Sequence, residues 1–166
     1  MSLAKQAALV ARLLKDKGIR VVFAESCTAG LASASLATQP GISEFHCGGM
    51  IVYRNGTKSA YLGISAKQLQ QSGAVSSGVA EAMATSVLAQ TPEAEIAAAV
   101  TGHLGPGSEP PLDGRYFIAV ARRATQSRTT APVRVLACDC RHRGRTARQR
   151  EVAERLLDVL ANTLSR

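Results

Sequence analysis

The chain has 166 residues and a formal net charge of +8; 46% of its residues are hydrophobic and 4% are aromatic. This length suits a single domain, residues 1–166, with a proper core. No apolar run approaches the roughly 20 residues of a membrane span, and no secretory signal precedes the first predicted helix, so no membrane partner is expected. The four cysteines form no disulfide-type pattern, which favours a reduced, cytoplasmic setting.

The positive charge is concentrated in one region. Residues 114–150 contain ten arginines and one acid, Asp139, which gives +9, whereas the ten basic and eleven acidic residues elsewhere give −1. Such a region attracts an anionic partner, either a nucleotide phosphate or a nucleic acid. Nucleic acid is the weaker candidate, because the only aromatic residues here are Tyr116 and Phe117, both in a strand-like run. A solvated helix start explains the same charges equally well.

The spacing of apolar residues and the cap residues predict helices and strands that alternate along the chain. Helices are predicted over residues 3–17, for about ten residues ending before 39, over 65–71 and 77–90, and from about 146 onward. Strands are predicted over residues 19–24, 48–53, 96–100, 116–121 and 133–138. Asn55-Gly56 predicts a tight turn. The alternation predicts an α/β fold: a single three-layer domain with a largely parallel or mixed sheet, helices on both faces and hairpin pairing late in the chain.

Two of the predicted strands end in loops rich in Gly, Ser and Thr, at residues 25–30 and 101–107. Ligands of open α/β sheets bind outside the carboxyl ends of the strands. We therefore expect Ser26, Thr28 and Thr101 at one binding rim, with Gly102 beside them. The segment 25–30 suits a phosphate or a carbonyl, although it lacks the lysine and the spacing of a P-loop. A plain strand-terminating turn is the alternative for residues 101 and 102.

Ser43, Tyr53 and Lys58 are the strongest catalytic candidates. A serine, a phenol and an amine are what an amide hydrolase without a Ser-His-Asp triad needs. If Lys58 is buried, its pKa falls and the neutral amine can take a proton from Ser43. Each residue also has a plainer interpretation, as a helix-cap serine, a packing tyrosine and a solvated surface amine. The catalytic hypothesis requires all three to meet in one pocket lined by strand-end loops.

Other reactive side chains give weaker patterns. Cys138, Cys140 and His142 alternate along the chain, so an extended backbone points all three to one face. A fourth ligand is not evident and zinc sites generally use Cys-x-x-Cys spacing, so no metal is expected. Cys27 fits a buried structural thiol better than a nucleophile, because no histidine lies near it in the sequence.

Five ordered segments together resemble the CinA C-terminal domain family, the nicotinamide-nucleotide amidases, over nearly the whole chain. They are residues 24–31 (AESCTAGL), 40–43 (PGIS), 52–58 (VYRNGTK) with 62–63 (LG), 73–76 (GAVS) with 82–84 (AMA), and 99–102 (AVTG) with 105–106 (GP). The resemblance implies hydrolysis of the carboxamide of nicotinamide mononucleotide to nicotinate mononucleotide and ammonia. It implies no cofactor, a small-molecule nucleotide substrate and a homo-oligomer.

The same resemblance implies roles for individual residues. The family's serine nucleophile corresponds to Ser43, and its accompanying tyrosine and lysine to Tyr53 and Lys58. Its hydroxyl-bearing pocket residues fall at Ser26 and Thr101. The arginine of its C-terminal G-D-R element best matches Arg145, near the region where a 5′-phosphate is expected.

The chain also departs from the family pattern. The departures are Ile42, His103-Leu104, the shortened loop at 108–111, Leu112-Asp113-Gly114 and Arg143-Gly144-Arg145. They keep two alternatives to the amidase open. One is a nucleotide-binding paralogue of the same fold that has lost its chemistry. The other, ranked last, is a nucleic-acid-associated protein that uses the basic cluster at 141–150.

Overall fold

A computed structural model of the chain describes residues 2–109, 111–124 and 133–166. Pro110 of the shortened loop and Arg128 of the basic stretch lie outside the described residues. Among the described helices, none is both long and apolar enough to cross a membrane.

A five-stranded mixed sheet forms the middle layer, in the order β2-β1-β3-β4-β5. Its strands are β1 (Val21–Glu25), β2 (His46–Ile51), β3 (Ile96–Gly102), β4 (Arg115–Arg122) and β5 (Val133–Asp139). β1 pairs in parallel with both β2 and β3, whereas β3–β4 and β4–β5 are antiparallel. The predicted mixed sheet with late hairpin pairing is thus confirmed.

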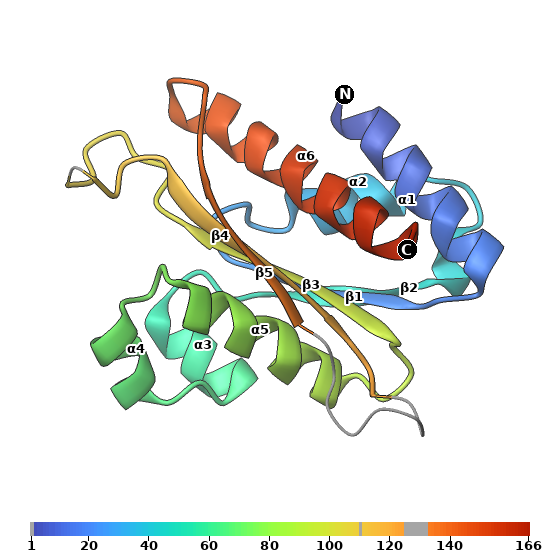
Figure 1. The fold of residues 1–166 in the computed structure, drawn as a ribbon, viewed down its shortest axis with the longest axis horizontal. Helices are drawn as coiled ribbons and strands as arrows, with labels where there is room; N and C mark the ends of the chain where they lie inside the picture. Colours follow the sequence, from blue (N-terminus) through green and yellow to red (C-terminus); the bar gives the residue numbers. More distant parts are fainter. Residues whose placement is uncertain (1, 110, 125–132) are drawn as a thin grey trace.

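Helices cover both faces of this sheet (Figure 1). One layer consists of α1 (Leu3–Lys17), α2 (Leu31–Ala37) and α6 (Arg145–Leu164); the other consists of α3 (Asn55–Leu62), α4 (Ala66–Ser72) and α5 (Ser77–Gln90). A hydrophobic core lies on each face of the sheet, and β1 contributes to both because successive strand side chains point to opposite faces. Phe23 packs in one core, and Val22 and Ala24 pack in the other. The three-layer α/β class is confirmed.

The local signals explain most helix ends. Gly18 ends α1 in the left-handed region, at φ +62°, and its N–H donates to the carbonyls of Leu14 and Lys15. The Ser65 hydroxyl accepts from the Gln68 N–H and caps α4 as predicted. The prediction of a tight turn at residues 55–56 is wrong.

Residues 55–56 instead begin helix α3, which local signals did not predict. An Asn-Gly pair favours a hairpin when a second strand follows, and here none does. The Thr57 side chain accepts a hydrogen bond from the Arg54 N–H, at 3.1 Å, and stabilises a helix start instead.

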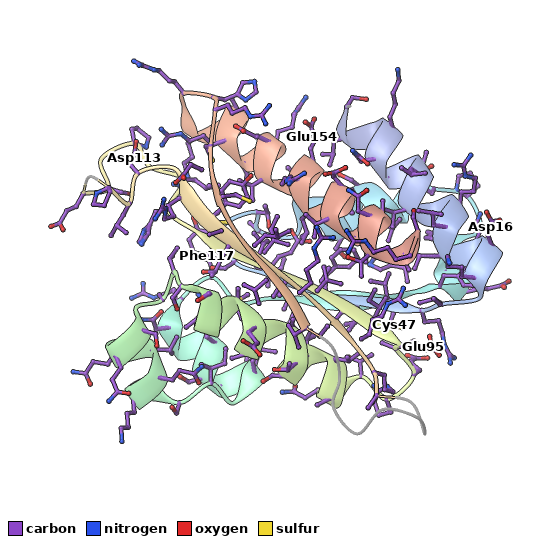
Figure 2. The ribbon with its side chains drawn as sticks, viewed as in Figure 1. Asp16, Cys47, Glu95, Asp113, Phe117 and Glu154 are labelled. Atoms are coloured by element: carbon purple, nitrogen blue, oxygen red, sulfur yellow. The ribbon has the colours of Figure 1, made fainter. Side chains whose placement is uncertain are left out.

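The parallel strands give the sheet two chemically different ends. The carboxyl ends of β1, β2 and β3 lie at the end where α6 begins, and Asp113, in the loop between β3 and β4, lies there too. Cys47 and Glu95 lie at the opposite end (Figure 2). The polar segments that follow β1, β2 and β3 therefore lie together at the end of the sheet where α6 begins.

Candidate active site

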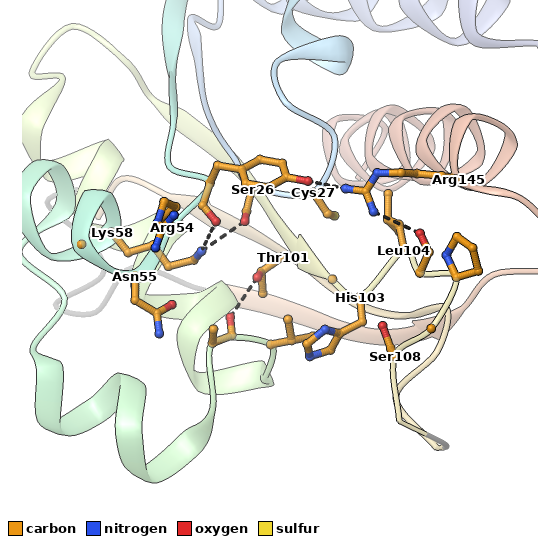
Figure 3. A pocket seen from close by; sticks show the side chains of 18 residues that line it. Ser26, Cys27, Arg54, Asn55, Lys58, Thr101, His103, Leu104, Ser108 and Arg145 are labelled. Carbon is orange, nitrogen blue, oxygen red and sulfur yellow. Dashed lines mark hydrogen bonds between the residues drawn. The ribbon is translucent and has the colours of Figure 1, made fainter.

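A cavity of about 540 Å³ opens at the carboxyl ends of β1 and β3 (Figure 3). Its volume lies within the ~300–1,000 Å³ usual for small-molecule sites. The segments after β1, β2 and β3 line it, together with the starts of α3 and α6 and the loop before α5. Six of the residues predicted from the sequence are among the lining: Ser26, Tyr53, Lys58, Thr101, Gly102 and Arg145. Ser26, Thr101 and Gly102 thus lie at one rim, as expected from the strand-end loops, and Tyr53, Lys58 and Arg145 line the same cavity.

Lys58 is buried at the bottom of this cavity, with only 2% of its surface exposed. It lies in the first turn of α3, and its Nζ reaches back to the Val52 carbonyl at 3.0 Å and to the Tyr53 carbonyl at 3.5 Å. Burial lowers the pKa of the Lys58 amine. The positive end of the α3 dipole acts in the same direction, because it disfavours a cation in the first turn.

The third contact of the amine is the Ser26 hydroxyl, with 3.1 Å between Nζ and Oγ. Ser26 follows β1 directly, is 6% exposed, and its N–H donates to the Val100 carbonyl of the neighbouring strand. Two carbonyls therefore take two N–H bonds of the amine, and in the neutral form its lone pair is left for Ser26. This is the geometry of a serine with an adjacent base.

The residues around Ser26 hold the turn after β1 in place. The buried carboxylate of Glu25 accepts hydrogen bonds from the N–H groups of Ala32 and Ser33, and so anchors the start of α2. Burial raises the pKa of the Cys27 thiol to about 12, which keeps it protonated and unreactive near neutral pH. Cys27 is the buried structural thiol that its sequence context favours.

Thr101 and Gly102 close the cavity from β3. The Thr101 hydroxyl is almost fully buried and donates to the Ala74 carbonyl at 2.9 Å, which ties the loop before α5 to the sheet. A Cβ atom at Gly102 would lie 2.6 Å from the Tyr116 Cβ, so only glycine fits there.

Tyr53 and Arg145, 92 residues apart in the chain, meet at the open side of the cavity. The Arg145 guanidinium donates to the Tyr53 hydroxyl and also to the Gly105 carbonyl, the latter at 3.0 Å. Arg145 begins α6, so this contact connects α6 to the segment after β2 and to the loop after β3. A cation is thereby held at the mouth of the cavity.

The start of α3 supplies further polar groups that sequence reasoning missed. Arg54, Asn55 and Gly56 line the cavity. The first intrahelical bond of α3 is donated by the Lys58 N–H to the Arg54 carbonyl, so the preceding N–H groups are left without intrahelical acceptors. Such groups favour negative charge.

Known proteins share both the sequence pattern and the fold of this chain. The family model of the CinA C-terminal domain matches residues 3–164. The chain belongs to the CinA C-terminal domain family. A CinA-like protein of Mycobacterium marinum is 48% identical over 99 residues, which are 60% of this chain and 23% of that protein. One of Prochlorococcus marinus is 39% identical over 158 residues, 95% of this chain and 36% of that protein.

This CinA C-terminal domain thus spans about a quarter to a third of the length of these curated relatives. Among solved structures, a CinA superfamily protein of Klebsiella pneumoniae superposes with a TM-score of 0.89 at 24% identity, covering 99% of both chains. The competence/damage inducible protein CihA of Agrobacterium tumefaciens superposes with a TM-score of 0.84 at 28% identity, covering 99% of this chain and 96% of that one. The family resemblance and the fold are confirmed.

Ser43 does not join the cavity, and the expectation that it meets Tyr53 and Lys58 there is wrong. It is exposed in the short 3-10 helix η1 (Ile42–Glu44), just before β2 begins. Because β2 runs parallel to β1, Ser43 lies at the amino ends of the strands and Tyr53 follows the carboxyl end. The six residues of β2 separate the two by about 20 Å. Ser26 occupies the place beside the amine instead.

Thr28 is also outside the cavity lining. It is 1% exposed, and its carbonyl accepts a hydrogen bond from the Gln149 side chain of α6. In the described part of the chain its hydroxyl has no hydrogen-bond partner. The turn at residues 26–29 places Thr28 against α6 and not in the cavity lining. The prediction that Thr28 lies at the binding rim is therefore wrong.

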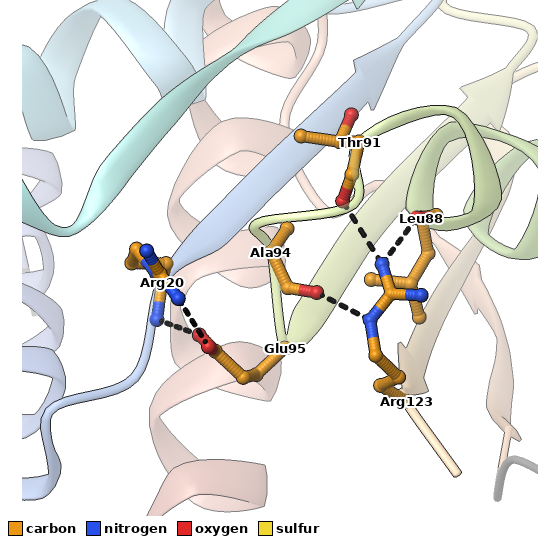
Figure 4. Close-up of polar contacts among 6 residues, drawn as sticks. All are labelled: Arg20, Leu88, Thr91, Ala94, Glu95 and Arg123. Carbon is orange, nitrogen blue, oxygen red and sulfur yellow. Dashed lines mark hydrogen bonds and ion pairs between the residues drawn. The ribbon is translucent and has the colours of Figure 1, made fainter.

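Among the described arginines of the basic stretch, Arg145 alone lines the cavity. Others serve the fold: Arg123 donates to the carbonyls of Leu88, Thr91 and Ala94 and closes the end of α5 (Figure 4). Figure 4 also shows Arg20 paired with Glu95.

The alternating cysteines and histidine do not gather as a ligand set. His142 pairs with Glu151, at 2.9 Å. Within the described ranges, no group of three or more His, Cys, Asp or Glu side chains is arranged to hold a metal ion.

Proposed function

We propose that this CinA C-terminal domain is an amidohydrolase that converts nicotinamide mononucleotide to nicotinate mononucleotide and ammonia, with Ser26 as nucleophile and Lys58 as base. The observation that carries the proposal is the 3.1 Å contact between the buried Lys58 amine and the Ser26 hydroxyl inside the cavity. A buried amine with a lowered pKa supplies the neutral base that a serine nucleophile requires.

The proposed reaction has two stages. The Ser26 Oγ attacks the carboxamide carbon while its proton passes to the Lys58 Nζ, and a tetrahedral oxyanion forms. The C–N bond then breaks, the leaving nitrogen takes the proton from Lys58 and departs as ammonia, and an ester of Ser26 remains. Water attacks this ester and gives a proton to Lys58; the bond between the acyl carbon and the Ser26 Oγ then breaks, Lys58 returns its proton to this Oγ, and nicotinate mononucleotide leaves.

Other lining residues supply charge where the reaction and the substrate need it. The N–H groups of Asn55 and Gly56, two lining residues in the first turn of α3, are suited to stabilise the developing oxyanion. Arg145, at the mouth of the cavity, suits the 5′-phosphate, because a guanidinium offers phosphate two parallel N–H donors. Its partner Tyr53 keeps that guanidinium at the mouth.

Ammonia release from nicotinamide mononucleotide tests the proposal, with nicotinamide riboside and free nicotinamide as comparison substrates. We expect turnover of the mononucleotide by the intact chain and its loss in Ser26→Ala. Unchanged turnover in Ser26→Ala would show that Ser26 is not the nucleophile. Thermal stabilisation by the mononucleotide without any ammonia would instead support the nucleotide-binding alternative.

A further inference from the structure

The loop at residues 103–108 forms one wall of the cavity and is attached to α6 by two arginines. Arg145 donates to the Gly105 carbonyl at 3.0 Å, and Arg148, one turn further along α6, donates to the Leu104 carbonyl at 3.2 Å. The position of this wall relative to α6 therefore depends on side chains of the first helical turn.

Arg148 has further partners that make it the centre of this region. Its guanidinium forms a two-point ion pair with Asp113, at 2.8 and 2.9 Å, and its Nε donates to the His142 carbonyl at 3.0 Å. The side chain of Arg148 is only 12% exposed and that of Asp113 is 33% exposed. One guanidinium thus joins two parts of the β3–β4 loop to the loop before α6, and its planar fork makes these bonds directional.

The ion pair also packs directly against Gly105. A Cβ atom built on Gly105 would lie 1.9 Å from the Asp113 Oδ1 and 2.9 Å from the Arg148 Nη1. The pair therefore sets where the Gly105 backbone lies, and the carbonyl of this same residue accepts the bond from Arg145. A shift of the pair moves Gly105 and with it the guanidinium at the mouth of the cavity.

We propose that Asp113 and Arg148 are positioning residues: their ion pair holds the loop at 103–108 and thereby places Arg145 for the phosphate end of the substrate. The substrate part of this inference rests on the proposed function. Ser26 lies directly after β1 and Lys58 lies on α3, and within the described residues neither side chain bonds to the pair. Loss of the pair is therefore expected to weaken substrate binding and to spare the chemical step.

The test compares Asp113→Asn with a matched control, Asp139→Asn. Asp139 forms the same kind of two-point pair with Arg115, at 3.0 and 3.1 Å, but both side chains are exposed and the bonds found for them within the described residues do not reach the loop at 103–108. We expect Asp113→Asn to raise KM for nicotinamide mononucleotide about tenfold, the scale of one weakened charged hydrogen bond. It should leave kcat within about twofold, and Asp139→Asn should change neither constant.

A second readout needs no substrate. In Asp113→Asn, amide hydrogen exchange in the loop at 103–108 should be about tenfold faster, and in Asp139→Asn it should be unchanged. If Asp113→Asn does not fold, Arg148→Lys serves, since it keeps the charge and loses the planar fork.

The outcomes separate the two proposals. Equal KM and equal exchange in the two asparagine variants would overturn the positioning role while leaving the amidase standing. Absence of ammonia release from the unmodified chain would overturn the amidase, and the exchange rates would still decide whether the pair holds the loop.

Discussion

Replacement of Lys58 by methionine distinguishes a catalytic amine from a structural cross-link. Replacing buried ionic groups by well-packed apolar side chains of similar volume is often neutral, and stabilises a protein by up to about 4 kcal/mol where a whole ion pair is replaced. Against this, the Val52 carbonyl loses a 3.0 Å hydrogen bond, and an unsatisfied buried acceptor costs about 1–3 kcal/mol. These contributions nearly cancel, so we expect the free energy of unfolding to change by less than about 2 kcal/mol.

Activity should respond quite differently. Without the base, ammonia release in Lys58→Met is expected to fall by at least about 10³-fold. Urea unfolding gives the stability, and Lys67→Met, which changes an exposed lysine on α4, is the matched control with unchanged activity. A loss of stability well above about 2 kcal/mol together with residual activity would show that Lys58 is a structural cross-link and would refute its assignment as the base.

The stability difference between the wild type and Lys58→Met should also depend on pH. The folded pKa of Lys58 lies below its unfolded value, so between these two values the folded chain binds fewer protons than the unfolded chain. Wild-type stability then rises with pH across this window, and the relative advantage of the methionine variant shrinks. A difference that grows with pH would contradict the assigned direction.

Four further results are expected. The kcat/KM for ammonia release should rise with pH through a midpoint below the usual lysine pKa, because only neutral Lys58 accepts a proton; a fall over that range would contradict this. Ser43→Ala should keep activity within about twofold, and a loss of activity in this variant would show that Ser43 takes part in the reaction. Gly102→Ala should cost about 1–3 kcal/mol in urea unfolding, because its Cβ would lie 2.6 Å from a side-chain carbon of β4, whereas Gly78→Ala on α5, with nothing within 4 Å, should not destabilise. Arg145→Ala should raise KM about tenfold for the mononucleotide and leave KM for the riboside unchanged; equal increases in KM for both substrates would show that Arg145 does not bind the phosphate.

The fold was largely predictable because its signals are local. The helical period of residues 3–17 and the cap at Ser65 each lie within one short segment, and both are found in the structure. The start of α3 was not predictable in this way. Asn55-Gly56 has the same local signature in a hairpin and at this helix start, and only the chain that follows decides between them.

The site depends on contacts between distant segments. Lys58 and Ser26 are 32 residues apart, and neither the burial of the amine nor its partner is visible in the local pattern. Ser43 was misplaced because its position follows from the parallel register of β2 on β1, which puts it at the wrong end of the sheet. Tyr53 and Arg145 were singled out separately, but their contact across 92 residues needed the fold.

Mass spectrometry of an acid-quenched reaction with nicotinamide mononucleotide tests the role of Ser26 most directly. We predict a nicotinate mononucleotide ester on the peptide that contains Ser26, absent from Ser26→Ala. Turnover with the adduct on another peptide, or with no adduct on Ser26 in rapidly quenched samples, would contradict this role.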